Sequence, residues 1–174
     1  MHQSSQVTVE HVVRPSTRPY EQVKAALETR MSMLTDIDEF VRQMAAANVS
    51  WEQIRCAIEE RLGSSGFSIF FKIEQGELLT LAGKPSRVTQ YAAGNPLLAI
   101  RMIEHEPDVA LYAPLRLALY EGKDGGSHII YDRFPSVVAP YKHSEVAAVA
   151  PIVQQQFDEL ITSVLGENPT ATTV

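Results

Sequence analysis

Two segments near residue 120 combine aromatic, basic, acidic and imidazole side chains that could bind and act on a small molecule. They flank a glycine-rich connection, Gly122 to Gly126, and glycine permits the positive φ that tight hairpins need. If Glu121 pairs with Ser127 across it, side-chain alternation places one chemically rich set on a single face of the hairpin. That set consists of Tyr112, Arg116, Tyr120, His128 and Asp132.

These side chains fit the recognition of an anionic or aromatic small molecule. The pairing puts Arg116 opposite Asp132, which would hold the guanidinium in place. His128, opposite Tyr120, can exchange a proton near neutral pH, so we predict His128 and Asp132 as catalytic and Tyr112, Arg116 and Tyr120 as ligand-binding. An ordinary cross-strand ion pair on a solvated or dimer-facing sheet explains the same residues without a ligand. A register slip by one residue would dismantle the arrangement.

Asn95 is a further candidate for ligand binding. It stands in a Gly94-Asn95-Pro96 corner before an apolar helical pattern, where backbone N–H groups at a helix N-terminus could bind an anion. Capping by Asn95, with Pro96 opening the first turn, explains the same residues without a ligand. Both interpretations remain open at this stage.

The sequence contains no recognisable metal-binding or cofactor-binding motif. The five histidines show no His-x-x-x-His spacing, and phosphate loops, dinucleotide fingerprints and nucleophile elbows are absent from the sequence. His11 and the neighbouring Glu10 could act together as a general base, although a structural role for His11 at a strand edge is favoured. Cys56 is the single cysteine, which excludes an intramolecular disulfide, and we expect it to be a buried small side chain on the apolar side of a helix.

Composition predicts one domain of 174 residues, with 45% hydrophobic and 21% charged residues. A formal net charge of -6 argues against broad electrostatic binding to nucleic acid or to anionic membranes. The N-terminal residues lack a signal-peptide pattern, and no segment has the length of apolar sequence that a spanning helix needs. We therefore expect a cytoplasmic protein.

The elements that must position these residues follow from hydrophobic periodicity. Phe67, Ile69, Phe71 and Ile73 alternate with other residues and predict one buried strand face, and Ser50 with Gln53 predicts a capping box. The order predicts an α+β fold with a mainly antiparallel sheet and helices on one face. We expect strands at 7–13, 67–73, 87–93, 112–121 and 127–133, helices at 20–31, 35–48, 50–62, 97–106 and 143–165, and a disordered tail at 167–174.

Four motifs in this chain resemble the family catalogued as domain of unknown function 302. They are Gly66-Phe67 entering a strand, the Gly94-Asn95-Pro96 corner, the strand Leu111-Tyr112-Ala113-Pro114-Leu115-Arg116, and Tyr131-Asp132 followed by a proline. The resemblance covers about 7–30 and 62–165. It implies a TATA-binding-protein-like α+β fold, often a homodimer, in bacterial or archaeal cytoplasm. It supplies no agreed catalytic residues, and the fold likeness does not imply DNA binding.

The segment 32–61 is longer than a compact family member needs. We therefore predict a single domain, with a core at about 7–31 and 62–165 and a helical insertion that could cover a pocket or build an oligomer contact. We expect a homodimeric small-molecule binding or regulatory module, without cofactor, nucleic acid or membrane partner. The alternative is a cofactor-independent isomerase, cyclase or lyase, in which His128 is acid or base while Arg116 and the tyrosines orient the substrate.

Overall fold

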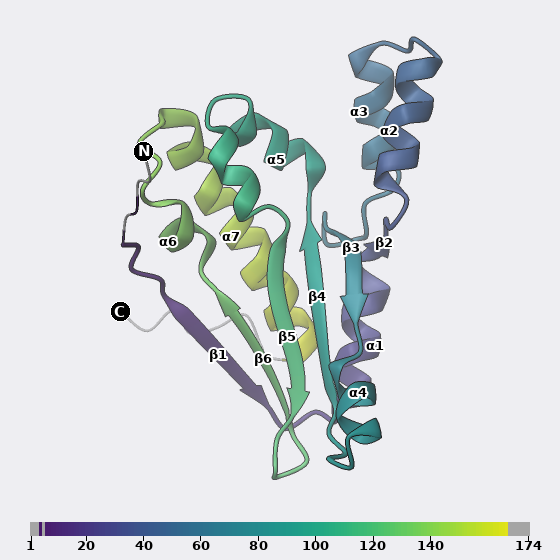
Figure 1. Ribbon diagram of the computed structural model, residues 1–174, viewed down its shortest axis with the longest axis vertical. Helices are drawn as coiled ribbons and strands as arrows, with labels where there is room; N and C mark the ends of the chain where they lie inside the picture. Colours follow the sequence, from purple (N-terminus) through teal and green to yellow (C-terminus); the bar gives the residue numbers. More distant parts are fainter. Residues whose placement is uncertain (1–3, 5, 167–174) are drawn as a thin grey trace.

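A single six-stranded sheet organises the chain, and its strands run in the order β1-β6-β5-β4-β3-β2 (Figure 1). The computed structural model describes residue 4 and residues 6–166. Neighbouring strands are antiparallel except β2 and β3, which confirms the expected mainly antiparallel α+β fold. The strands are β1 (His11–Ser16), β2 (Ser32–Met33), β3 (Ser68–Ile73), β4 (Val88–Gly94), β5 (Leu115–Glu121) and β6 (Ser127–Asp132).

Two helices, α1 and α7, cover one face of the sheet, and no helix of the described chain covers the other (Figure 1). Leu119 of β5, Ile129 of β6 and Phe157 of α7 are fully buried in the core between them. None of the helices that the structure describes is long and apolar enough to cross a membrane. The helices are α1 (Tyr20–Arg30), α2 (Ile37–Ala46), α3 (Trp51–Glu59), α4 (Gln75–Leu81), α5 (Pro96–Ile103), α6 (Phe134–Val138) and α7 (Ser144–Leu165), with a 3-10 helix at Pro107–Leu111.

The β5–β6 hairpin has the expected register. Leu119 pairs with Ile129, and Tyr120 pairs with His128. The first pair is buried against the helices and the second faces the uncovered side. The hairpin therefore presents Arg116, Tyr120, His128 and Asp132 on the face that α1 and α7 leave open. The expected strand start at 112 is wrong, because β5 begins at Leu115 and Tyr112 lies before it, at the end of the 3-10 helix Pro107–Leu111.

Strand β1 differs from the prediction of a strand at 7–13 that ends before Pro15. It begins at His11 and continues through Pro15 to Ser16. The strand lies at the edge of the sheet, where proline is tolerated because its missing N–H can face away from the only neighbouring strand. This edge position, which depends on pairing with β6 late in the chain, has no local signal in the sequence.

The predicted single buried face of β3 is wrong. Phe67 and Ile69 are fully buried, but Phe71 and Ile73 keep 42% and 44% of their surface exposed. A β-bulge shifts the register between Ile69 and Phe71, and one extra residue sends every later side chain to the opposite face. The bulge thereby adds two large apolar side chains to the open face of the sheet.

Helices α2 and α3 form a hairpin that projects beyond the sheet, and we call it the arm (Figure 1). The capping box at its turn is confirmed, because Ser50 Oγ accepts from Gln53 N and Gln53 Oε1 accepts from Ser50 N. Cys56 is exposed, so the expectation of a buried small side chain is wrong. The arm occupies the segment for which we expect an insertion, and the predicted tail at 167–174 lies outside the described residues.

Candidate functional site

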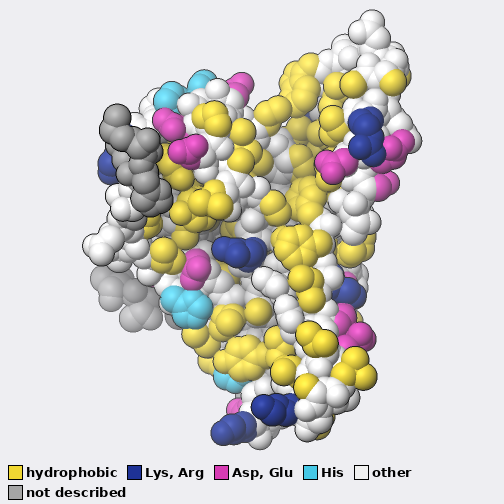
Figure 2. Space-filling model, in the orientation of Figure 1, with side chains coloured by type: hydrophobic (Ala, Val, Ile, Leu, Met, Phe, Trp, Pro, Cys, Tyr) yellow, Lys and Arg dark blue, Asp and Glu magenta, His cyan; other side chains and the backbone are white. Residues whose placement is uncertain are grey.

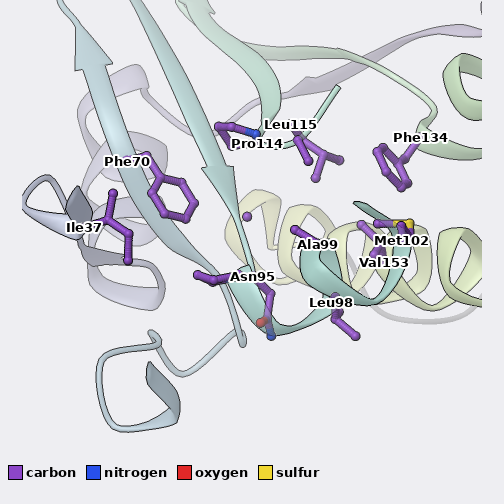
Figure 3. A pocket seen from close by; sticks show the side chains of 13 residues that line it. Ile37, Phe70, Asn95, Leu98, Ala99, Met102, Pro114, Leu115, Phe134 and Val153 are labelled. Carbon is purple, nitrogen blue, oxygen red and sulfur yellow. The ribbon is translucent and has the colours of Figure 1, made fainter. Parts of the chain in front are cut away.

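An apolar cavity of about 240 Å³ lies at the end of the sheet beside α5. Figure 3 shows Ile37 and Phe70 on one side and Phe134, Met102 and Val153 on the other. Asn95 is the only polar side chain among its described lining residues. The lining is Ile37, Phe70, Gly94, Asn95, Pro96, Leu98, Ala99, Met102, Ala113, Pro114, Leu115, Phe134 and Val153.

Asn95 lines this cavity, but its side chain already has a structural role. Its Oδ1 accepts a hydrogen bond of 2.9 Å from the N–H of Leu97, and Pro96 occupies the first helical position of α5. The capping interpretation of the corner is therefore confirmed. With this oxygen engaged, the cavity wall is effectively apolar.

A small hollow adjoins the cavity and carries three of the predicted site residues. Tyr112, Arg116 and Asp132 line this hollow of about 40 Å³. Pro114, Leu115 and Phe134 line both this hollow and the cavity, so the two spaces are adjacent and share part of their walls. A wider, open hollow of about 230 Å³ continues from Arg116 and Asp132 across the sheet to His11 and Gln90. Apolar and charged surfaces thus meet at Arg116.

The charges at this meeting point are not paired as expected. Asp132 turns to β1, where its Oδ1 lies 2.9 Å from His11 Nδ1, instead of forming the predicted ion pair with Arg116. Arg116 is exposed and has no hydrogen-bonding or charged partner within the part of the chain that the structure describes. Asp132 sits between cross-strand neighbours on β1 and β5, and the sequence did not indicate that β1 would supply one of them.

Tyr120 and His128 form a separate group nearer the hairpin turn. Their rings stack at 4.8 Å between centroids, with 7° between planes. His128 Nδ1 is buried and has no hydrogen-bond partner among the described residues. A Cβ on Gly122 would lie 2.6 Å from His128 Nε2, so glycine at this position makes room for the ring. Neither residue lines the cavity or the two hollows next to it. The structure therefore separates Tyr120 and His128 from the predicted site residues around Arg116.

Sequence reasoning missed a polar cluster on the helix-covered face, between α1 and strands β3 and β4. Glu74 lies at its centre, and its carboxylate contacts Lys24 at 2.7 Å, Lys72 at 3.2 Å and Thr89 at 2.6 Å. Glu28 accepts a hydrogen bond from Lys72. No spacing rule joins these residues, because they come from four separate elements or their ends.

The electrostatics of this cluster are those of matched charges. Burial raises the pKa of Glu74, but hydrogen bonds from Lys24, Thr89 and Lys72 lower it by more than burial raises it. The pKa of Glu74 is therefore below its usual value. Burial lowers the pKa of Lys24, yet its bond to Glu74 outweighs this and the pKa is raised. Each group thus favours its charged form, as expected of a stabilising cluster. Across the described residues, no group of three or more His, Cys, Asp or Glu side chains could hold a metal ion.

Comparison with known families tests the resemblance found in the sequence. Residues 42–164 match the model of DUF302, described as a domain of unknown function, which is more than half of the chain. The chain belongs to the DUF302 family. A solved structure described as an uncharacterized conserved DUF302 protein from Bacillus stearothermophilus superposes with a TM-score of 0.59 and 14% sequence identity. The match covers 87% of this chain and 94% of that one, and it supports the fold alone. No curated protein matches the chain.

The DUF302 match includes most of the candidate site. Arg116, Asp132 and Asn95 lie inside the matched segment, whereas Ile37 of the arm and His11 of β1 lie outside it. The family supplies no activity for these residues.

Proposed function

We propose that this DUF302 protein is a small-molecule binding module whose ligand occupies the apolar cavity beside α5. The observation that carries the proposal is the cavity itself, about 240 Å³ of space walled by apolar side chains and by a capped asparagine. Pockets for drug-sized ligands are generally larger, so this volume suits a small molecule with an apolar body. Transfer of such a body from water into the cavity is favourable in proportion to the apolar area that it buries.

The proposal is tested by filling the cavity. Ala99 of α5 lines it, so Ala99→Leu places three additional carbon atoms in the ligand space. With octan-1-ol as an uncharged probe followed by NMR titration, we expect saturable binding to the unchanged protein and at least about a tenfold loss of affinity in the variant. Ala45→Leu, on an exposed position of the arm, is the matched control and should bind as the unchanged protein does. Equal affinity in both variants, or no saturable binding at all, would overturn the proposal.

The alternative of a cofactor-independent enzyme that uses His128 as acid or base has weaker support. His128 stacks on Tyr120 and lines none of the spaces around Arg116. A general acid or base must come within hydrogen-bond reach of the reacting group. A ligand in the cavity would lie next to Tyr112 and Arg116, away from that imidazole.

The proposal also includes a homodimer formed through the open face of the sheet. Figure 2 shows hydrophobic side chains spread over this face, with basic, acidic and imidazole groups near its centre. Val13, Phe71 and Ile73 are large apolar residues that remain substantially exposed on these strands. Large apolar surfaces of this kind favour association with another protein surface.

A further inference from the structure

Arg116 places a positive charge directly beside the apolar cavity. Its hollow shares Pro114, Leu115 and Phe134 with the cavity wall, and Tyr112 lies on the same hollow. No described residue neutralises the guanidinium through an ion pair or hydrogen bond. A guanidinium offers planar, paired N–H donors that match the two oxygens of a carboxylate. The local geometry therefore combines a site for a carboxylate with a site for an apolar chain.

The acidic side chain that lines the same hollow contacts a residue of β1. Asp132 also lines the hollow, but its Oδ1 lies 2.9 Å from Nδ1 of His11, the residue directly opposite it on β1. The opposite neighbour of Arg116 on β4 is Ala92, which has neither charge nor hydrogen-bonding side-chain atoms. His11 thus holds Asp132 on the β1 side and leaves the guanidinium available to a ligand.

We infer that the ligand is an amphiphilic monocarboxylate, with its apolar chain in the cavity and its carboxylate on Arg116. This inference rests on the proposed function and specifies the ligand class of the same site. A single negative charge is favoured because a second one would lie near the Asp132 carboxylate, where like charges repel. The cavity volume of about 240 Å³ restricts the chain to short or medium length.

The test compares octanoate with octan-1-ol, two probes with the same chain and different head groups, on the full-length protein. Arg116→Gln should weaken octanoate binding by about 10- to 100-fold, the range of one charge-assisted hydrogen-bonding contact, and leave octan-1-ol unchanged. Arg87→Gln is the matched control, because it removes the same charge from an exposed arginine that is paired with Glu121. The control should alter neither affinity.

Two further variants move the octanoate affinity in opposite directions. Asp132→Asn removes the neighbouring negative charge and should tighten octanoate binding by about threefold to tenfold. His11→Ala releases the Asp132 carboxylate, which can then compete for Arg116, and should weaken octanoate binding by a similar factor. Octan-1-ol should respond to neither change, whereas general damage to the fold would weaken both probes together.

The outcomes separate this inference from the proposed function. If octan-1-ol binds in the cavity while Arg116→Gln leaves octanoate binding unchanged, the carboxylate assignment is overturned and the proposed function stands. If neither probe binds, both are overturned. If octanoate binding depends on Arg116 but Ala99→Leu does not weaken it, the anion binds on the surface and the amphiphile is rejected.

Discussion

At the scale of single residues, the structure separates charges with several partners from charges with few. Glu74 receives three contacts from side chains of α1, β3 and β4, and its carboxylate is mostly withdrawn from solvent. Asp132 has one contact, on the exposed surface of the sheet. Removing one partner of a buried or half-buried charge pair is destabilising because the other charge is left uncompensated, whereas exposed pairs contribute little.

Glu74→Gln should destabilise the fold by about 1 to 3 kcal/mol, because it removes the charge that Lys24 and Lys72 share and leaves both ammonium groups without it. The free energy of unfolding from urea titration at pH 7 measures this loss. Glu39→Gln is the matched control, since Glu39 contacts Arg42 on the exposed surface of the arm. The control should change stability far less, and equal losses in the two variants would contradict the role assigned to Glu74.

The same comparison has a defined pH dependence. Because the folded-state pKa of Glu74 is lowered from 4.5, its stabilising contribution is present above about pH 4.5 and is lost as the pH falls through the folded-state pKa. The stability difference between the unchanged protein and Glu74→Gln should therefore shrink on acidification. A difference that grows below pH 4 would contradict the direction of the shift.

At the scale of elements, the arm depends on local interactions more than the sheet does. Its turn is fixed by the Ser50 and Gln53 capping box, and Phe40 packs under the Arg61 guanidinium at 4.4 Å. Valine and tryptophan side chains on the arm, Val41 and Trp51, are about half exposed. An element with few buried apolar contacts opens more readily than the core of its domain.

Ser50→Ala should loosen the arm without unfolding the sheet. Loss of an N-cap costs about 1 kcal/mol, so amide hydrogen exchange in α3 should accelerate by about fivefold. Exchange in β5 and α7 should stay unchanged. Ser50→Asn keeps a capping side chain and serves as the control, with α3 exchange close to that of the unchanged protein. Faster exchange across the whole chain would show that the arm and the sheet open together.

Elements with local signals could be predicted from the sequence, and those fixed by distant contacts could not. Ser50 with Gln53 predicted the start of α3, and the glycines between Glu121 and Ser127 predicted the hairpin register. The reversed face of Phe71 and Ile73 depends on a bulge that β4 pairing defines, so alternation alone gave the wrong face.

The candidate site shows the same division. Strand register placed Arg116 and Asp132 on one face, and both line one hollow, whereas Tyr112 lines the same hollow from outside β5. The partner of Asp132 required the pairing of β1 with β6, which joins the two ends of the domain. The cavity itself depends on how α5, the arm and α6 meet, and side-chain packing between separate elements has no sequence period to reveal it.

At the scale of the whole molecule, one face of the sheet buries the core and the other remains available. The uncovered row across the middle of the sheet runs from Val13 through Ile130 and Ala118 to Gln90 and Ile73. A two-fold contact between such rows would bury each copy's apolar residues against the other's.

Ile73→Lys should shift the proposed dimer toward the monomer, because each new charge would have to be buried at the contact. Size-exclusion chromatography with light scattering should report the mass of two chains for the unchanged protein and of one chain for the variant. Ile152→Lys, on the exposed side of α7 across the sheet, is the control and should remain dimeric. A monomeric unchanged protein, or dissociation by both variants, would contradict a dimer through the open face.

The pairing of β1 with β6 also sets an order in time. His11 and Asp132 are 121 positions apart, so a ribosome that adds about 5 to 20 residues per second exposes β1 for about 6 to 24 s before its partner is made. Pro15 removes one backbone N–H donor from β1, which makes pairing of the still unpaired β1 with a wrong strand less favourable. The contact between His11 and Asp132, which turns Asp132 away from Arg116, can form only after this interval. The arrangement of charges around Arg116 is therefore established late in synthesis of the chain.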